Sequence, residues 1–168
     1  MLDLLSGSFS TELGLATIAG RMVAAAGLGL VIGFDRELRS VAAGLRTHML
    51  VALASATFAI LAFEIVAQAM REGVDNTDPV RIIEAVTAGV AFLAAGTIIR
   101  GGDRVHGLTT GAGLWLAGSI GLACGVGAYA VAVLATVLGI VILTLLRRLE
   151  HVIATKPRTP TGDADIGN

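Results

Sequence analysis

The longest charge-free run, from Gly107 to Leu146, limits what this chain of 168 residues can fold into. As one continuous helix the run would extend about 60 Å, at roughly 1.5 Å per residue. One crossing of the hydrocarbon core needs only about 30 Å, so the run predicts two crossings with a break between them. The segment Gly125-Val126-Gly127 supplies that break. The sequence therefore predicts an integral membrane protein.

Composition favours membrane helices over a water-soluble domain. Hydrophobic residues make up 55% of the chain and the mean hydropathy is +0.82, which exceeds the range of soluble domains. Because no strand-like alternation of apolar and polar residues appears, we expect an all-α, polytopic transmembrane helix bundle and not a barrel. The net charge of −1, without a basic cluster that carries interleaved aromatic residues, argues against nucleic acid as a partner.

Five spans of about 20 residues each are predicted. They cover residues 15–34, 48–68, 79–99, 108–124 and 128–146. Asp78 and Pro79 indicate an N-cap followed by proline at the first helical position of the third span. Residues 1–14 are expected to form an interfacial segment, residues 15–150 the five-span membrane domain, and residues 151–168 a disordered tail. No soluble C-terminal domain is expected after the spans.

Lysine and arginine residues are concentrated in alternate loops. Residues 35–47, residues 100–106 and the segment after Leu146 are rich in them, whereas the segment before Arg21 and the turn near Gly125 contain none. By the positive-inside rule the basic segments are cytoplasmic, and their alternation with the other segments requires an odd number of spans. We therefore predict that the N-terminus is outside and the C-terminus is cytoplasmic.

Glycine pairs at helical spacing lie in three of the predicted spans. Small residues at such spacings let two helix backbones approach closely in lipid. The pairs are compatible with packing inside one bundle and with a face that joins two copies into a homodimer, and the sequence leaves both open. The pairs are Gly29 with Gly33, Gly89 with Gly96, and Gly121 with Gly125.

Three charged residues, Arg21, Glu64 and Glu84, fall within the predicted spans. An ionised side chain at such depth is costly alone, so we expect Arg21 to lie near Glu64 or Glu84. Two interpretations remain open. Either Arg21 and Glu64 form a structural pair and Glu84 reaches the interface, or the surplus carboxylate binds a proton or a cation.

A larger polar group is predicted at the cytoplasmic face, because short loops bring the ends of the first four spans to one side of the membrane. We expect one cluster with Glu37, Arg46 and Thr109 at its centre and Arg100 holding the third span to the first. In one interpretation this cluster is the functional site. In the other, positive-inside bias, snorkelling arginines and helix capping account for the same residues, and both interpretations stay open. The candidate residues are Asp35, Arg36, Glu37, Arg46, Thr47, His48, Arg100, Thr109 and Thr110.

Catalytic and cofactor-binding motifs are missing from the sequence. It contains no HExxH, no GxSxG and no P-loop. The three histidines lack the spacing of metal ligands, and the single cysteine, Cys124, has no neighbouring base. We therefore expect no enzymatic activity, no cofactor and no metal site.

Five segments together resemble the MgtC/SapB family of bacterial membrane proteins. They are GFDRE at residues 33–37, AGLRTHMLV at 43–51, DPVRI at 78–82, AFLAAGTIIR at 91–100 and VHGLTTGAGLW at 105–115. The resemblance covers residues 21–150, with the segments in family order. The chain departs from the family in two ways. Ala91 and Ala94 replace two glycines of the usual Gly-Phe-Leu-Gly-Ala-Gly. Many members also carry a soluble C-terminal domain, which is not expected here.

The resemblance implies a multi-pass protein of the bacterial inner membrane. It implies a role in growth under magnesium limitation and in survival inside host phagocytes, and it implies restraint of the F-type ATP synthase. Three hypotheses follow, and we favour the first. The chain is a non-enzymatic modulator of ion homeostasis that acts through a membrane-protein partner; it is a transporter or channel for a cation, proton or small solute; or it is an intramembrane enzyme.

Overall fold

The computed structural model describes residues 11–74, 78, 80–102 and 104–154, with residues 146–154 described by their backbone alone. Within these residues the chain forms five helices and one two-stranded sheet. Their order is α2 (Leu15–Glu37), α3 (Leu45–Arg71), α4 (Val80–Gly96), β1 (Ile99–Gly101), β2 (Arg104–His106), α5 (Leu108–Val126) and α6 (Tyr129–Ala154). The predicted all-α membrane fold is confirmed. The predicted interfacial segment lies mostly outside the described residues, and so does most of the predicted tail.

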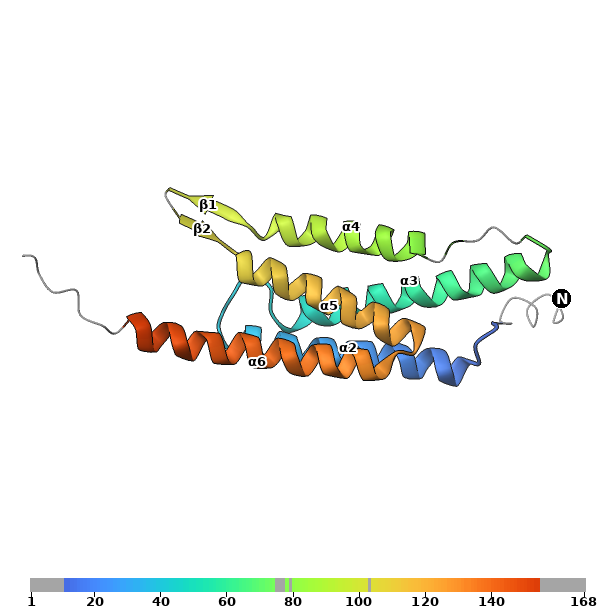
Figure 1. The fold of residues 1–168 in the computed structure, drawn as a ribbon, viewed down its shortest axis with the longest axis horizontal. Coiled ribbons are helices and arrows are strands. Elements are labelled where there is room, and N and C mark those ends of the chain that lie inside the picture. Colours follow the sequence, from blue (N-terminus) through green and yellow to red (C-terminus); the bar gives the residue numbers. More distant parts are fainter. Residues whose placement is uncertain (1–10, 75–77, 79, 103, 155–168) are drawn as a thin grey trace, which may run out of the picture.

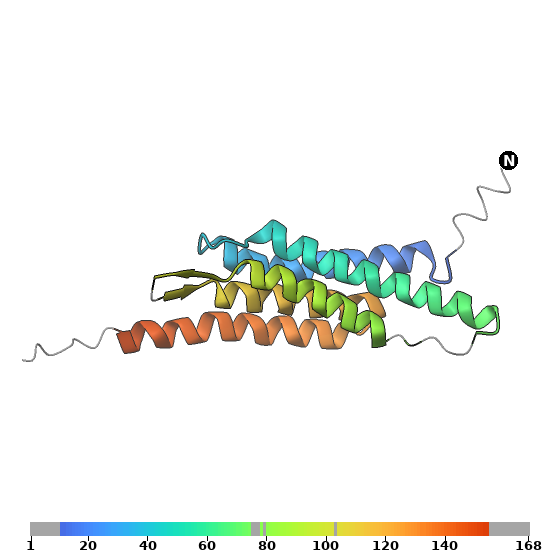
Figure 2. The same ribbon diagram turned by 90° about the horizontal axis from the view of Figure 1, so that it is seen from above.

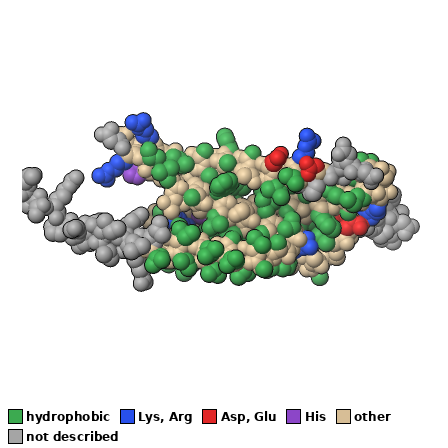
Figure 3. Space-filling view, viewed as in Figure 1, with side chains coloured by type: hydrophobic (Ala, Val, Ile, Leu, Met, Phe, Trp, Pro, Cys, Tyr) green, Lys and Arg blue, Asp and Glu red, His purple; other side chains and the backbone are tan. Residues whose placement is uncertain are grey.

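Three helices, α2, α3 and α5, are long and apolar enough to cross a membrane. α4 is shorter, with 17 residues, and the apolar stretch of α6 covers Tyr129–Leu145. Exposed hydrophobic side chains occur on every helix. On the face in Figure 3 they cover much of the middle of the molecule, and the charged side chains lie at its two ends and in a few places between the centre and the right-hand end. This distribution fits a bundle whose middle contacts hydrocarbon.

Helix ends follow the local signals in the sequence. α5 ends at Val126, and Gly127 takes a left-handed conformation (φ 87°) that L side chains rarely adopt. Asp78 accepts a hydrogen bond from the amide of Val80 at 2.9 Å, which confirms it as a cap of α4. α4, in contrast, ends at Gly96, before the predicted end of the third span at Ile99. In place of the loop that we expected after this span, the strands Ile99–Gly101 and Arg104–His106 form an antiparallel hairpin in which Ile99 pairs with His106.

α5 occupies the centre of the bundle and contacts α2, α3, α4 and α6. α4 and α6 lie on opposite sides of α5 (Figure 1). The hairpin β1–β2, the connection between α2 and α3, and the C-terminal end of α6 lie at one end of the molecule in both ribbon views (Figures 1 and 2). We call it the hairpin end. The C-terminal end of α3 lies at the opposite end.

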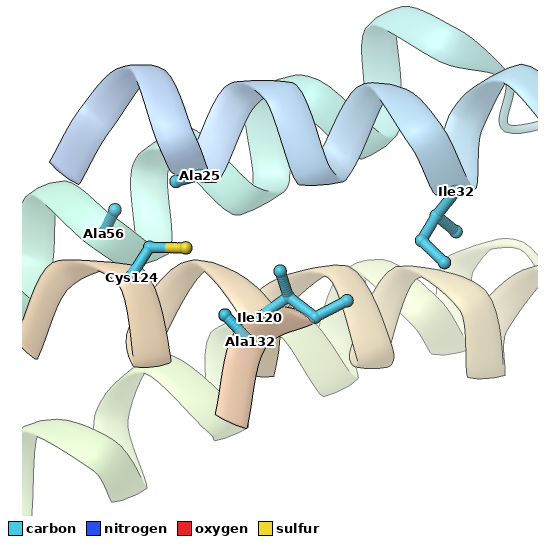
Figure 4. Close-up of a cluster of buried hydrophobic side chains, with 6 residues drawn as sticks. All are labelled: Ala25, Ile32, Ala56, Ile120, Cys124 and Ala132. Carbon is cyan, nitrogen blue, oxygen red and sulfur yellow. The ribbon is translucent and has the colours of Figure 1, made fainter. Parts of the chain in front are cut away.

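Small residues let the helix backbones approach closely. A Cβ atom on Gly121 of α5 would overlap the carbonyl oxygen of Ala52 on α3, and one on Gly29 of α2 would lie 2.8 Å from the carbonyl oxygen of His48. Packing within the bundle is thus confirmed for these glycines. Ala94, one of the two alanines that replace family glycines, packs on Gly111 of α5. The buried cluster in Figure 4 joins four helices through the residues Ala25, Ile32, Ala56, Ile120, Cys124 and Ala132.

Candidate functional site: a buried polar cluster

Three polar side chains from three helices are buried at the hairpin end. Arg36 of α2 is 5% exposed, His48 of α3 is fully buried, and Thr110 of α5 is 4% exposed. Nη2 of Arg36 donates a hydrogen bond to Oγ1 of Thr110 at 3.1 Å, which ties α2 to α5. We call these three residues the buried polar cluster. All three were among the predicted site residues.

Helical phase explains why these three residues are buried and their neighbours are not. Buried positions recur every three or four residues on α2, α3 and α5, as on any helix with one face toward a core. Each member of the buried polar cluster continues such a stripe at the hairpin end of its helix. The stripes include Ala25, Gly29, Ile32 and Arg36; His48, Ala52, Ser55 and Ala59; and Thr110, Leu114, Ala117 and Gly121.

His48 is held between two glycines. A Cβ atom on Gly33 of α2 would lie 3.1 Å from the Cβ of His48, and one on Gly113 of α5 would lie 3.1 Å from its Nε2. Nδ1 of His48 lies 2.8 Å from the carbonyl oxygen of Gly44. Because a carbonyl only accepts, Nδ1 carries the proton, and Nε2 of the neutral ring is then an acceptor. Among the described residues this buried Nε2 has no hydrogen-bond partner.

Arg36 is also incompletely satisfied. A guanidinium offers five N–H donors, yet Nε of Arg36 is buried without a partner in the described part of the chain. The adjacent carboxylate, Asp35, binds Arg39 through two hydrogen bonds of 2.8 and 2.5 Å, which raises the pKa of Arg39. The only side-chain partner described for Arg36 is therefore the neutral hydroxyl of Thr110. Asp35 offsets part of the desolvation of this buried cation electrostatically, but it accepts no described hydrogen bond from Arg36. The desolvation is the larger effect, so the burial of Arg36 still costs stability.

The residues that we expected at the centre of the site lie outside this cluster. Glu37, Arg46 and Thr109 are all exposed. They stand one or two positions away from Arg36, His48 and Thr110, and so point away from the buried stripes. Glu37 accepts a hydrogen bond from the amide of Leu45 at 2.9 Å and closes the connection between α2 and α3.

The remaining predicted residues of this group are also near the surface. Thr47 is exposed and Asp35 is half-buried. Arg100 is exposed on β1, and its Nε donates to the carbonyl oxygen of Gly102 at 3.3 Å. Among the described residues Arg100 makes no hydrogen bond or ion pair with α2, so no such bond ties the third span to the first there.

The predicted ion pair between Arg21 and a carboxylate was wrong. Nη1 of Arg21 donates instead to the carbonyl oxygen of Gly125 at 2.7 Å. Glu64 accepts hydrogen bonds from the amides of Glu12 and Leu13, at 2.7 and 3.0 Å. Glu84 is exposed on α4.

Backbone groups, rather than opposite side chains, accept or donate the described hydrogen bonds of these two charges. The last carbonyl groups of a helix lack partners and carry a partial negative charge, and Arg21 meets such a carbonyl in the C-terminal turn of α5. Glu64 accepts from two amides of the segment that precedes α2. Because backbone groups occur at every residue, the sequence marks neither contact.

The described residues offer no obvious metal or nucleophilic chemistry. They include no group of three or more His, Cys, Asp or Glu side chains that could hold a metal ion. Cys124 is buried in the apolar core. What the buried polar cluster offers is a guanidinium with spare donors and an imidazole with a spare acceptor.

Most of the chain matches the sequence model of one protein family. The sequence model of the "MgtC family" matches residues 22–152. The "Protein MgtC" of Brucella abortus (strain 2308) is 39% identical over 139 residues, which are 83% of this chain and 55% of the relative. The "Protein MgtC" of Salmonella typhimurium (strain LT2) is 37% identical over 142 residues, 84% of this chain and 58% of the relative.

A third relative carries a different name. The "Putative magnesium transporter YhiD" of Escherichia coli (strain K12) is 33% identical over 136 residues, which are 81% of this chain and 63% of the relative. The alignments thus span little more than half the length of these curated relatives. No solved structure matches the chain.

Proposed function

Because the chain belongs to the MgtC family of membrane proteins, we propose that it is a non-enzymatic inner-membrane protein that modulates ion homeostasis. Its role is adaptation to magnesium limitation, and in a pathogen this adaptation supports survival inside host cells. It acts by binding membrane-protein partners, of which the F-type ATP synthase is the one that the family resemblance implies. A homodimer is a further assembly to be tested.

The observation that carries this proposal is the buried polar cluster. Arg36 is 5% exposed and hydrogen-bonds a neutral hydroxyl, although replacing such a buried charge by an apolar side chain is often neutral or stabilising. Costly polar groups of this kind occur where a function requires them. We infer that Arg36, His48 and Thr110 set the arrangement of α2, α3 and α5 at the surface that a partner contacts.

We place the hairpin end in the cytoplasm. Several arginines lie at or beside it, including Arg36, Arg39, Arg46, Arg100 and Arg104. The positive-inside rule supports this orientation. Cysteines introduced at Gly73 and at Arg104 test it, since Cys124 is the only native cysteine and is buried. In intact cells a membrane-impermeant maleimide should label the cysteine at position 73 and not the one at position 104, and the reverse labelling would reject the orientation.

Growth complementation at low magnesium tests the role of the cluster. Arg36→Met and Thr110→Val should abolish complementation, with membrane abundance unchanged for Arg36→Met. Arg71→Met is the matched control, because Arg71 is exposed and its pairing with Glu12 is on the surface. If Arg36→Met supports growth as well as Arg71→Met does, the cluster is structural and the proposal fails.

Transport is the second function to be tested, because the name of the Escherichia coli relative describes a magnesium transporter. Purified protein in liposomes that contain a magnesium-sensitive dye gives a direct measure of flux. A modulator should leave the flux equal to that of protein-free liposomes. Flux that disappears in Glu64→Gln or Glu84→Gln would support the transporter and overturn the modulator.

A further inference from the structure

An apolar groove runs between α3 and α4. It has a volume of about 530 Å³ and extends from Val51 to Ile65 on α3 and from Ile82 to Leu93 on α4. No charged side chain lines it, and Ser55 supplies its one hydroxyl. On α3, the distance from Val51 to Ile65 is 14 helical steps, or about 21 Å. The groove therefore follows much of the depth of the bilayer.

The groove exists because α4 packs mainly on α5 and touches α3 less. Gly89 lines it, and a Cβ atom at Gly89 would meet nothing within 4 Å. In contrast, a Cβ on Gly118 of α5 would lie 2.9 Å from Val90. One side of α4 thus interlocks with the bundle, and the side at Gly89 is open for another molecule.

The volume of the groove fits hydrocarbon chains better than a helix. A helix about 10 Å in diameter occupies about 1,600 Å³ over 21 Å of length. A hydrocarbon chain about 4 Å wide occupies about 190 Å³ over the roughly 15 Å depth of one leaflet. The two chains of one phospholipid would take about 380 Å³, which is within the 530 Å³ available.

The two ends of the groove differ in the balance of their charges. At the hairpin end, Arg46 precedes Val51 on one wall, and the hairpin that follows α4 carries Arg100 and Arg104 against one acid, Asp103. Arg46, Arg100 and Arg104 are all exposed. At the opposite end the nearest charged residues of the two walls include Glu64, Arg81 and Glu84. The arginines would attract a phosphate, and the carboxylates would not.

The hairpin itself is suited to the boundary between headgroups and hydrocarbon. Ile99 is 65% exposed and Val105 is 50% exposed, and each stands beside an arginine on its strand. Such pairs place an apolar side chain in the hydrocarbon and a cation at the headgroups. The hairpin end of the groove therefore lies at the depth of the lipid phosphates.

From these observations we propose that the groove between α3 and α4 binds one anionic phospholipid of the adjoining leaflet. Its acyl chains lie along Val51, Ser55 and Gly89, and its phosphate lies near Arg100 and Arg104. The proposal does not depend on which side of the membrane the hairpin end faces, and it is separate from the role of the buried polar cluster.

Tryptophan fluorescence in vesicles tests the site. The chain has one tryptophan, Trp115, so Phe58→Trp with Trp115→Phe places a single reporter on α3, at a groove residue that is 55% exposed. The protein is placed in phosphatidylcholine vesicles in which about one lipid in ten is replaced by dibrominated phosphatidylglycerol or by dibrominated phosphatidylcholine, and the quenching of the reporter is measured. The anionic lipid should bind the groove more tightly than the neutral one, by roughly fivefold for each arginine that engages its headgroup.

Two matched controls define the expected result. A reporter at Leu138→Trp on α6, 52% exposed in the native chain, should show less than a twofold preference between the lipids. Arg100→Gln with Arg104→Gln should remove the preference at the groove, and Arg100→Lys with Arg104→Lys should keep it.

Three results would overturn the proposal. Equal quenching by both lipids at the groove would mean that lipid binds there without headgroup selection. A preference that survives Arg100→Gln with Arg104→Gln would place the headgroup elsewhere. Weak quenching by both lipids, which rises as the protein is diluted in lipid, would mean that a second copy of the chain covers the groove.

Discussion

Removing the hydroxyl of Thr110 measures what the buried polar cluster contributes to stability. Thr110→Val keeps the shape of the side chain and deletes the acceptor of the 3.1 Å hydrogen bond from Arg36. A hydrogen bond to a charged group contributes about 1.5–3 kcal/mol, and its loss leaves another guanidinium N–H buried without a partner. We expect the free energy of unfolding to fall by about 2 kcal/mol, a roughly 30-fold change in the ratio of folded to unfolded protein.

A double-mutant cycle separates this contact from other effects of the substitution. Arg36→Met removes the buried charge and should leave the unfolding free energy unchanged or raise it. In that background the Thr110 hydroxyl can bond a backbone carbonyl of its own helix, so Thr110→Val should cost less than about 0.5 kcal/mol. The expected coupling energy between Arg36 and Thr110 is therefore about 1.5–2 kcal/mol.

Unfolding in mixed detergent micelles, followed by circular dichroism, is a suitable assay. Thr109→Val is the control, because Thr109 is exposed one residue away and its replacement should change stability by less than about 0.5 kcal/mol. An equal cost of Thr110→Val in the native and the Arg36→Met backgrounds would refute the reasoning, since the two side chains would then be energetically independent.

Further substitutions test the contacts at the opposite end and the helix packing. Arg21→Leu should lower the free energy of unfolding by about 1–2 kcal/mol, because the carbonyl of Gly125 loses its donor; micelle unfolding measures this, and Arg21→Lys should restore part of it. Glu64→Gln should release residues 11–14 from α3 and increase proteolysis near Glu12, and unchanged cleavage would contradict the assigned hydrogen bonds. Gly121→Ala should cost about 1–3 kcal/mol by overpacking against α3, whereas Gly89→Ala should be neutral or should raise the melting temperature.

The sequence was sufficient to predict a helix boundary where that boundary has a local cause. Gly127 breaks the charge-free run through its positive φ, and Asp78 caps α4 with its own side chain. The hairpin at residues 99–106 was missed, because three-residue strands that carry arginines give no clear alternation of apolar and polar residues.

The buried polar cluster was predictable in part. The helical phase that buries Ala25, Gly29 and Ile32 also places Arg36 on the inner face, and this signal separates Arg36 from Glu37. The partner of Arg21 was not predictable in this way. It is a backbone carbonyl 104 residues further along the chain, and every residue has such a group, so no residue type marks it.

The central position of α5 has a consequence for how the chain assembles during synthesis. α2, α3 and α4 leave the ribosome before α5, and α2 and α3 already have complementary surfaces at Gly29 and Gly33. Arg36, however, has no Thr110 to bond until α5 has entered the membrane. We therefore expect Arg36 to gain its hydroxyl partner, and α4 its main packing surface, only when residues 108–126 have inserted.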